Sequence, residues 1–114
     1  MRKDVVGTLY LIHFTVPVSD RAYHYLGWTE REQEGKRLNE HIKGHGARIC
    51  AAAVQQGATL LMVRTWQGKT RDDERRLKKQ RNHKLLCPLC REARLKHLAE
   101  LKRKRYHERK EATP

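Results

Sequence analysis

The stretch that most constrains the fold is residues 7–27, GTLYLIHFTVPVSDRAYHYLG. Residues 9–14 are a β-rich run with few polar interruptions. Turn-forming residue types follow it, namely Pro17, Ser19 and Asp20. A second β-rich run, residues 23–26, returns from this turn, and Gly27 ends it. The pattern predicts a β-hairpin, with the two runs as neighbouring strands of one sheet.

Further elements follow the hairpin. A capping-box pattern starting at Thr29 predicts a helix over residues 29–43, and an alanine-rich segment predicts another over residues 47–56. Residues 59–66, TLLMVRTW, form an apolar run suited to the centre of a sheet. A loop and a second capping-box pattern, starting at Thr70, predict one more helix. Together these elements indicate a small α/β (α+β) fold.

The charge of the chain bounds its partners. The 114 residues carry a formal net charge of +13, and 34% of them are charged. Such a chain attracts polyanions, so we expect nucleic acid, and DNA in particular, as the partner. No apolar run approaches the ~20 residues of a spanning helix, so we expect no membrane segment. Three cysteines, an odd number, suit a reducing cytoplasmic compartment better than a disulfide scaffold.

Composition changes near Cys87. We predict a domain over residues 1–86 and a tail over residues 87–114. The tail has leucines at helical spacing and many charges, which predicts a basic helix whose N-terminal half packs on the domain. The candidate DNA-binding residues are a basic cluster in this tail and two cations of the domain: Lys102, Arg103, Lys104, Arg105, Arg64 and Lys78.

Three polar residues of the predicted helices have both an ordinary and a chemical interpretation. Arg37 and His41 lie four residues apart and share a helix face, which is usually a solvated surface. Glu74 lies in a first helical turn, where a carboxylate complements the helix dipole. In phosphodiester hydrolysis, however, a carboxylate holds Mg²⁺, a guanidinium binds phosphate, and an imidazole moves protons.

The order of these motifs resembles the GIY-YIG nuclease family. Residues 8–10, Thr-Leu-Tyr, stand where the family has Gly-Ile-Tyr, and residues 25–27, Tyr-Leu-Gly, stand where it has Tyr-Ile-Gly. The resemblance covers residues 7–84. It implies a small three-stranded antiparallel sheet flanked by helices, and DNA cleavage that depends on one divalent metal.

The resemblance also implies a role for each matching residue. Tyr10 corresponds to the family's general base, and Tyr25 to the tyrosine that orients water or phosphate. Arg37 corresponds to the arginine that stabilises the transition state, and His41 to a histidine one turn later. Glu74 corresponds to the glutamate that holds Mg²⁺ or another divalent cation.

Two functions without catalysis compete with a metal-dependent DNA endonuclease. One is a nucleic-acid-binding protein that keeps the GIY-YIG fold, and the other is a structural RNA-associated basic protein. A binding protein needs Lys and Arg, but it has no use for one positioned carboxylate that repels phosphate. Glu74 therefore favours the enzyme. No separate recognition domain is visible, so high sequence specificity would require a homodimer or another partner.

The segment Cys87 to Cys90, CPLC, has the spacing of half a zinc site. His83 and His97 are candidates for completing four zinc ligands. A basic chain rich in histidine offers many chance matches of this kind. The interpretation that we favour is therefore a tight turn with two free thiols.

Overall fold

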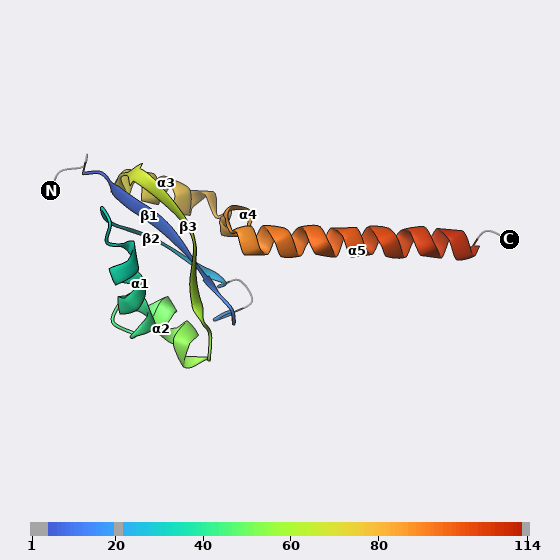
Figure 1. Ribbon diagram of the computed structural model, residues 1–114, viewed down its shortest axis with the longest axis horizontal. Helices are drawn as coiled ribbons and strands as arrows, with labels where there is room; N and C mark the ends of the chain where they lie inside the picture. Colours follow the sequence, from blue (N-terminus) through green and yellow to red (C-terminus); the bar gives the residue numbers. More distant parts are fainter. Residues whose placement is uncertain (1–4, 20–21, 113–114) are drawn as a thin grey trace.

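The computed structural model describes residues 5–19 and 22–112, so Asp20 lies outside the described residues. The elements are β1 (Gly7–Phe14), β2 (His24–Glu30), α1 (Glu34–Ile42), α2 (Arg48–Gln55), β3 (Leu60–Lys69), α3 (Arg71–Gln80), α4 (His83–Leu86) and α5 (Pro88–Ala112). Figure 1 shows α1 and α2 on one side of the sheet and α5 projecting away from it. The predicted class, a three-stranded antiparallel sheet with flanking helices and a C-terminal helix, is confirmed.

β1 is the central strand of the sheet, whose order is β2-β1-β3 with both pairs antiparallel. The apolar run of residues 59–66 belongs to the edge strand β3, so its predicted central position is wrong. β1 is buried along almost its whole length, whereas Leu60 alone among the residues of β3 is fully buried. The apolar run therefore did not indicate the place of β3 in the sheet, where β1 and not β3 has hydrogen-bonded neighbours on both sides.

The side chains of β1 alternate between two hydrophobic cores, as expected for a strand covered on both faces. The first core, on the side of α1 and α2, contains Tyr10, Ile12, Phe14, Cys50, Ala53 and Leu60. The second core, on the opposite face, contains Leu11, Leu26 and Cys87. Leu77 of α3 and Leu86 of α4 cover this second core. Each face of the sheet therefore carries its own candidate site.

β2 continues through Gly27 to Glu30 and does not end at the glycine. Gly27 lies opposite Tyr10, and a Cβ atom at this position would overlap the Tyr10 ring. The glycine therefore permits a close approach and does not stop the strand. Thr29, predicted to cap a helix, is a buried strand residue, and α1 begins only at Glu34 without a side-chain cap. Pairing with β1 overrides the local capping signal.

Two predicted helix boundaries are confirmed. At the start of α3, the N–H of Asp73 donates to Thr70 Oγ1 (3.2 Å), and the N–H of Thr70 donates to the Asp73 carboxylate (2.8 Å). At the end of α2, Gly57 has a φ of +90° and its N–H donates to the carbonyl of Val54. Residues 67–69, expected in a loop, instead extend β3 along β1.

α5 is a single helix of 25 residues that leaves the domain. Residues 91–111 are all exposed, and Leu95, Leu98 and Leu101 are among them. The prediction that the N-terminal half of the tail packs on the domain is therefore wrong beyond Cys90. Within the part of the chain that the structure describes, no helix is both long and apolar enough to cross a bilayer.

Candidate functional site

The five predicted catalytic residues come from four elements, and the structure brings them together around the Tyr10 and Tyr25 rings. They are Tyr10 of β1, Tyr25 of β2, Arg37 and His41 of α1, and Glu74 of α3. The centre of the buried Tyr10 ring lies 6.2 Å from that of Tyr25 and 5.9 Å from that of His41. The ring centres of Tyr25 and His41 are 5.0 Å apart. We call these five residues the tyrosine cluster.

The hydrogen bonds of His41 define the proton positions in this cluster. The backbone N–H of Ala47 donates to His41 Nδ1 (3.0 Å), so Nδ1 carries a lone pair. The proton of the neutral ring is then on Nε2, which donates to the Tyr10 hydroxyl oxygen (2.9 Å). Burial, and secondly the charge of Arg37, lower the pKa of His41 and keep the ring neutral. A Cβ atom at Gly46 would overlap this ring, so the glycine allows the α1–α2 loop to close on it.

Arg37 lies one helical turn before His41 and also acts on Tyr10. Burial, and secondly the neighbouring Tyr25, raise the pKa of Tyr10 far above its ordinary value. A hydrogen bond from Arg37 and its positive charge oppose this shift. Arg37 is held by Glu40, with 2.6 Å between guanidinium nitrogen and carboxylate oxygen. The Tyr10 oxygen therefore receives two N–H donors, which is an arrangement that stabilises a tyrosinate.

Glu74 faces the tyrosine cluster from α3. Its side chain is only 15% exposed and lies 3.6 Å from the ammonium nitrogen of Lys78. Burial, and secondly the negative charge of Glu74, raise the pKa of Tyr25. The Lys78 ammonium lies 5.7 Å from the centre of the Tyr25 ring. A single carboxylate suits Mg²⁺, which takes one or two carboxylates and keeps several waters.

Two groups of predicted DNA-binding residues lie away from the tyrosine cluster. Arg64 is opposite Leu11 in the register, on the face of the second core. Its guanidinium lies 4.6 Å from the centre of the Trp66 ring and donates to the carbonyl of Leu86 (3.4 Å), so it ties β3 to α4. The basic residues 102–105 lie in the distal half of α5, where all four are exposed.

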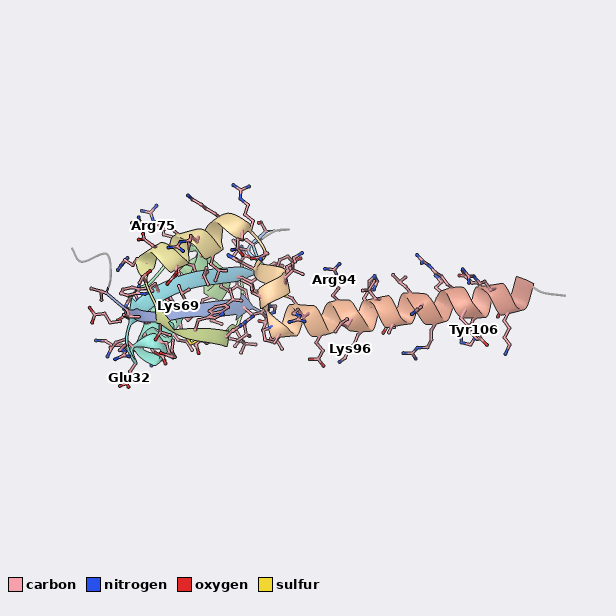
Figure 2. The ribbon with its side chains drawn as sticks, turned by 90° about the horizontal axis from the view of Figure 1, so that it is seen from above. Glu32, Lys69, Arg75, Arg94, Lys96 and Tyr106 are labelled. Atoms are coloured by element: carbon pink, nitrogen blue, oxygen red, sulfur yellow. The ribbon has the colours of Figure 1, made fainter. Side chains whose placement is uncertain are left out.

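A basic cleft of about 770 Å³ lies between α3, α4 and the start of α5. Four of its lining residues are cations, namely Lys78, Arg81, Lys84 and Arg94. Figure 2 shows Arg94 and Lys96 projecting from opposite sides of α5, and Arg94 is the one that lines the cleft. Lys78 belongs to this cleft and also contacts Glu74 and Tyr25. The cleft therefore extends the positive surface from the tyrosine cluster toward α5.

A second group of potential ligands lies on the opposite face of the sheet, where His13 pairs with His24 next to the hairpin turn. His13, His24, Cys87 and Cys90 each present one ligand atom, and all four atoms lie within 4.8 Å of one another. This His/Cys cluster can hold a metal ion. Burial, followed by the nearby charges of His13, His83 and Lys84, lowers the pKa of His24 to about 4. Neutral imidazole is the form that binds metals.

The sequence-based interpretation of the two cysteines holds only in part: Cys87 and Cys90 do belong to a group that can hold a metal ion. The thiols are free, but they do not form an isolated turn, because they lie against two histidines. The histidines are not the expected ones either. His97 is exposed on α5, and His83 is not one of the four converging residues.

The hairpin pattern itself contained a signal for the two histidines that we missed. Alternation along β1 places His13 on the same face as Leu11. The strand pairing then places His24 directly opposite His13, on the face that Cys87 covers. A search restricted to neighbours of the CPLC segment in sequence overlooks ligands supplied by a distant hairpin.

Comparison with known proteins adds no assignment. No family model, curated protein or solved structure matches this chain. Any function therefore has to be argued from the chain's own residues, which form a tyrosine cluster on one face of the sheet and a His/Cys cluster on the other.

Proposed function

We propose that this protein is a metal-dependent endonuclease of the GIY-YIG type, which hydrolyses DNA phosphodiester bonds. The observation that supports it best is the tyrosine cluster, in which Tyr25 of β2 and the α1 residues Arg37 and His41 surround Tyr10 of β1. Glu74 of α3 faces Tyr25 in the same cluster. An ordinary solvated helix face does not bury a histidine against a tyrosine, as His41 is buried here. Structural packing alone also gives no reason for a carboxylate to face Tyr25.

Hydrolysis requires a deprotonated nucleophile, neutralisation of charge on phosphorus, and stabilisation of the leaving oxygen. A divalent cation such as Mg²⁺ at Glu74 would supply Lewis-acid stabilisation of the phosphate charge. Glu74 fits such an ion because it is a hard oxygen ligand. The His/Cys cluster does not, because its nitrogen and sulfur ligands select softer metals. We therefore assign the two clusters to different ions.

In this proposal Tyr10, ionised to tyrosinate, accepts the proton of the attacking water and becomes a neutral phenol. His41 Nε2–H and Arg37 both donate to the Tyr10 oxygen, so they stabilise the tyrosinate that is needed for this step. His41 acts as a positioning donor and not as the base, since Nδ1 is occupied by the Ala47 N–H. Tyr25 orients the water or the phosphate, and Arg37 neutralises charge on the transferred phosphoryl group.

The DNA backbone would follow the positive surface. Lys78 lies beside Glu74, and Arg81, Lys84 and Arg94 continue along the basic cleft. Lys and Arg contacts of this kind position a duplex without reading its sequence. The exposed basic residues 102–105 would add further phosphate contacts at a distance from the reaction.

The decisive experiment incubates the purified protein with supercoiled plasmid and Mg²⁺ or Mn²⁺, with an EDTA control. Glu74→Gln keeps the size and shape of the side chain but removes its charge. We expect cleavage to fall by at least about a hundredfold, because the metal supplies charge stabilisation worth several kcal/mol. DNA binding without metal should persist or strengthen, since a negative charge facing phosphate is removed.

Asp72→Asn is the matched control for that variant. Asp72 lies in the same first turn of α3, carries the same charge, and pairs weakly with Arg75 at 3.6 Å. Its substitution should leave cleavage within about twofold. Equal cleavage by wild type and Glu74→Gln would show that the site is misassigned.

A binding protein that keeps the fold without catalysis is the second candidate. The net charge of +13 and the basic cleft favour it, because DNA binding without catalysis is enough to explain both features. Salt-sensitive DNA binding by a folded protein that cuts no substrate with any divalent metal would select this candidate.

A further inference from the structure

Two histidines of the hairpin and two cysteines of the α4–α5 junction converge on one point. His13 lies near the end of β1, opposite His24, the first residue of β2. Cys87 follows α4, and Cys90 lies in the first turn of α5. His13 presents Nδ1 to His24, Cys87 and Cys90 alike, and His24 presents Nε2 to both His13 and Cys90. Each imidazole thus directs a single nitrogen toward the shared centre.

Four of the six separations within the His/Cys cluster are close to the edges of a zinc tetrahedron, and all six are within 4.8 Å. With Zn–N near 2.05 Å and Zn–S near 2.3 Å, tetrahedral angles place two nitrogens about 3.3 Å apart and a nitrogen and a sulfur about 3.6 Å apart. The two histidine nitrogens are 3.2 Å apart. From His13 Nδ1 the two sulfurs lie at 3.6 and 3.7 Å, and from His24 Nε2 the Cys90 sulfur lies at 3.3 Å.

Hydrogen bonding alone is a poor explanation of this arrangement. A thiol is a weak donor and a weak acceptor, and a neutral imidazole has only one N–H. Such groups gain little from pointing at a common centre, because most of their lone pairs then face one another. A cation at that centre satisfies all four lone pairs at once.

We propose that His13, His24, Cys87 and Cys90 bind one structural Zn²⁺ and that this ion fastens α5 to the sheet. Two nitrogens and two sulfurs form a ligand set that zinc prefers, and Mg²⁺ and Ca²⁺ do not. Four protein ligands leave no position for a substrate, so the site is structural. Both cysteines bind as thiolates, and zinc binding releases their two protons to solvent.

α5 depends on this ion because little else holds it to the domain. Its side chains are exposed at residues 91–111, and within the described part of α5 Cys90 is the residue that packs against the second core. Cys87 is fully buried in that core beside Leu11 and Leu26. Zinc bonds to both thiolates would join the base of α5 to two strands at a single point.

The same ion would set the shape of the basic cleft. His24 lines the cleft as well as the His/Cys cluster, and Arg94 lies one turn beyond Cys90. Fixing the base of α5 therefore fixes Arg94 relative to Lys78 and Lys84 on the other walls. The consequence for DNA affinity rests on the proposed function, whereas the zinc site itself does not.

The first test measures zinc in the full-length protein, purified and reconstituted with a thiol reductant, by elemental analysis. We expect one zinc per chain and release of that zinc by a strong chelator. Cys90→Ser and His24→Asn should each lower zinc affinity by at least about tenfold. Cys50→Ala is the control, because Cys50 is buried in the first core and should leave zinc binding unchanged.

Cobalt substitution keeps the test decisive if a variant folds poorly. Stoichiometric Co²⁺ should give the strong visible bands of a tetrahedral site and a thiolate-to-cobalt charge-transfer band, and Zn²⁺ should displace it. An octahedral spectrum, no stoichiometric zinc in reduced wild type, or equal zinc loss in Cys50→Ala would overturn the proposal. Recovery of Cys87 and Cys90 as a disulfide under the same reducing conditions would overturn it too.

Hydrogen exchange tests the role in fastening α5. Zinc removal from wild type should raise exchange in residues 83–90 by at least about tenfold and leave residues 48–55 of α2 nearly unchanged. Equal hydrogen exchange in residues 83–90 with and without zinc would contradict the proposal that zinc fastens α5 to the sheet. If the zinc-loaded protein does not cleave DNA, that result would count against the proposed endonuclease. It would leave the proposal of a zinc site standing.

Discussion

At the scale of single residues, the chemistry of Tyr10 depends on His41. The imidazole accepts the Ala47 N–H at one nitrogen and donates to the Tyr10 hydroxyl from the other. The Tyr10 hydroxyl is buried, so it has no ready replacement for this partner, and the Ala47 N–H is part-buried. In the proposed endonuclease, the same ring would therefore serve both the fold and the reaction.

His41→Ala tests this double role. It should lower the free energy of unfolding by about 1–3 kcal/mol, because the buried Tyr10 hydroxyl and the part-buried Ala47 N–H lose their partner. Cleavage should fall as well, since Tyr10 loses a donor. His45→Ala is the control, because His45 is exposed in the following loop. Urea denaturation measures the stability, and equal effects of the two substitutions would contradict the assigned hydrogen bonds.

The raised pKa of Tyr10 predicts how cleavage depends on pH. Burial, and secondly Tyr25, raise this pKa, so the tyrosinate is scarce near neutral pH. If Tyr10 is the base, the rate should climb with pH by about tenfold per unit from about pH 6 to 9. Single-turnover cleavage measures the slope. Tyr10→Phe should abolish cleavage, and a flat profile in wild type would rule out Tyr10 as the base.

The sequence predicted the residues of the tyrosine cluster better than those of the His/Cys cluster. The resemblance named Tyr10, Tyr25, Arg37, His41 and Glu74, and the fold brings these five together. His13 and His24 escaped notice. They are far from the cysteines in sequence; His24 and Cys90, for example, are 66 residues apart. The hairpin register places the two histidines side by side, where the cysteines can contact them.

At the scale of elements, β2 and α1 show how pairing overrides local signals. Residues 29–32 form a capping-box pattern, but Thr29 is buried in β2 and α1 begins later. The hairpin and the helices α2 and α3 were predictable, because alternation, alanine content and the Thr70 cap act locally. The order of strands was not, since it depends on which strand finds partners on both sides.

Two glycine substitutions separate the effect of strand packing on β2 from the effect of local helix propensity on α1. Gly27→Ala should destabilise the protein by about 1–3 kcal/mol, because the new methyl group would overlap the Tyr10 ring in a packed core. Gly35→Ala should stabilise it by about 0.5–1 kcal/mol, because the site is open and alanine favours a helix. Thermal unfolding compares them, and shifts of the same sign would refute this account of Gly27.

At the scale of the whole molecule, the charge is spread between a compact domain and a projecting helix. The principal extents are 71, 31 and 21 Å, and α5 accounts for the long dimension (Figure 1). The basic residues 102–105 therefore lie well beyond one Debye length from the tyrosine cluster, which is about 8 Å at physiological salt. If the protein binds DNA as proposed, each part would contribute to that binding separately.

Truncation after Ala99 tests this separation. It removes residues 102–105 but retains Arg94 and the His/Cys cluster. We expect the slope of log K against log salt for duplex DNA to become shallower by about 0.9 for each phosphate that the shortened chain no longer neutralises. The domain should stay folded, because the residues removed are exposed. Fluorescence anisotropy at several salt concentrations measures the slope, and an unchanged slope would show that the distal helix does not touch DNA.

The length of α5 has a consequence for the footprint on DNA. A helix of 25 residues is about 37 Å long, close to one turn of B-form duplex at about 34–36 Å. A chain bound through both its domain and its distal helix would protect the DNA on one side of the scissile bond. The DNA on the other side would stay unprotected. The scissile bond would then sit at the border of the protected stretch, about ten base pairs from its far end.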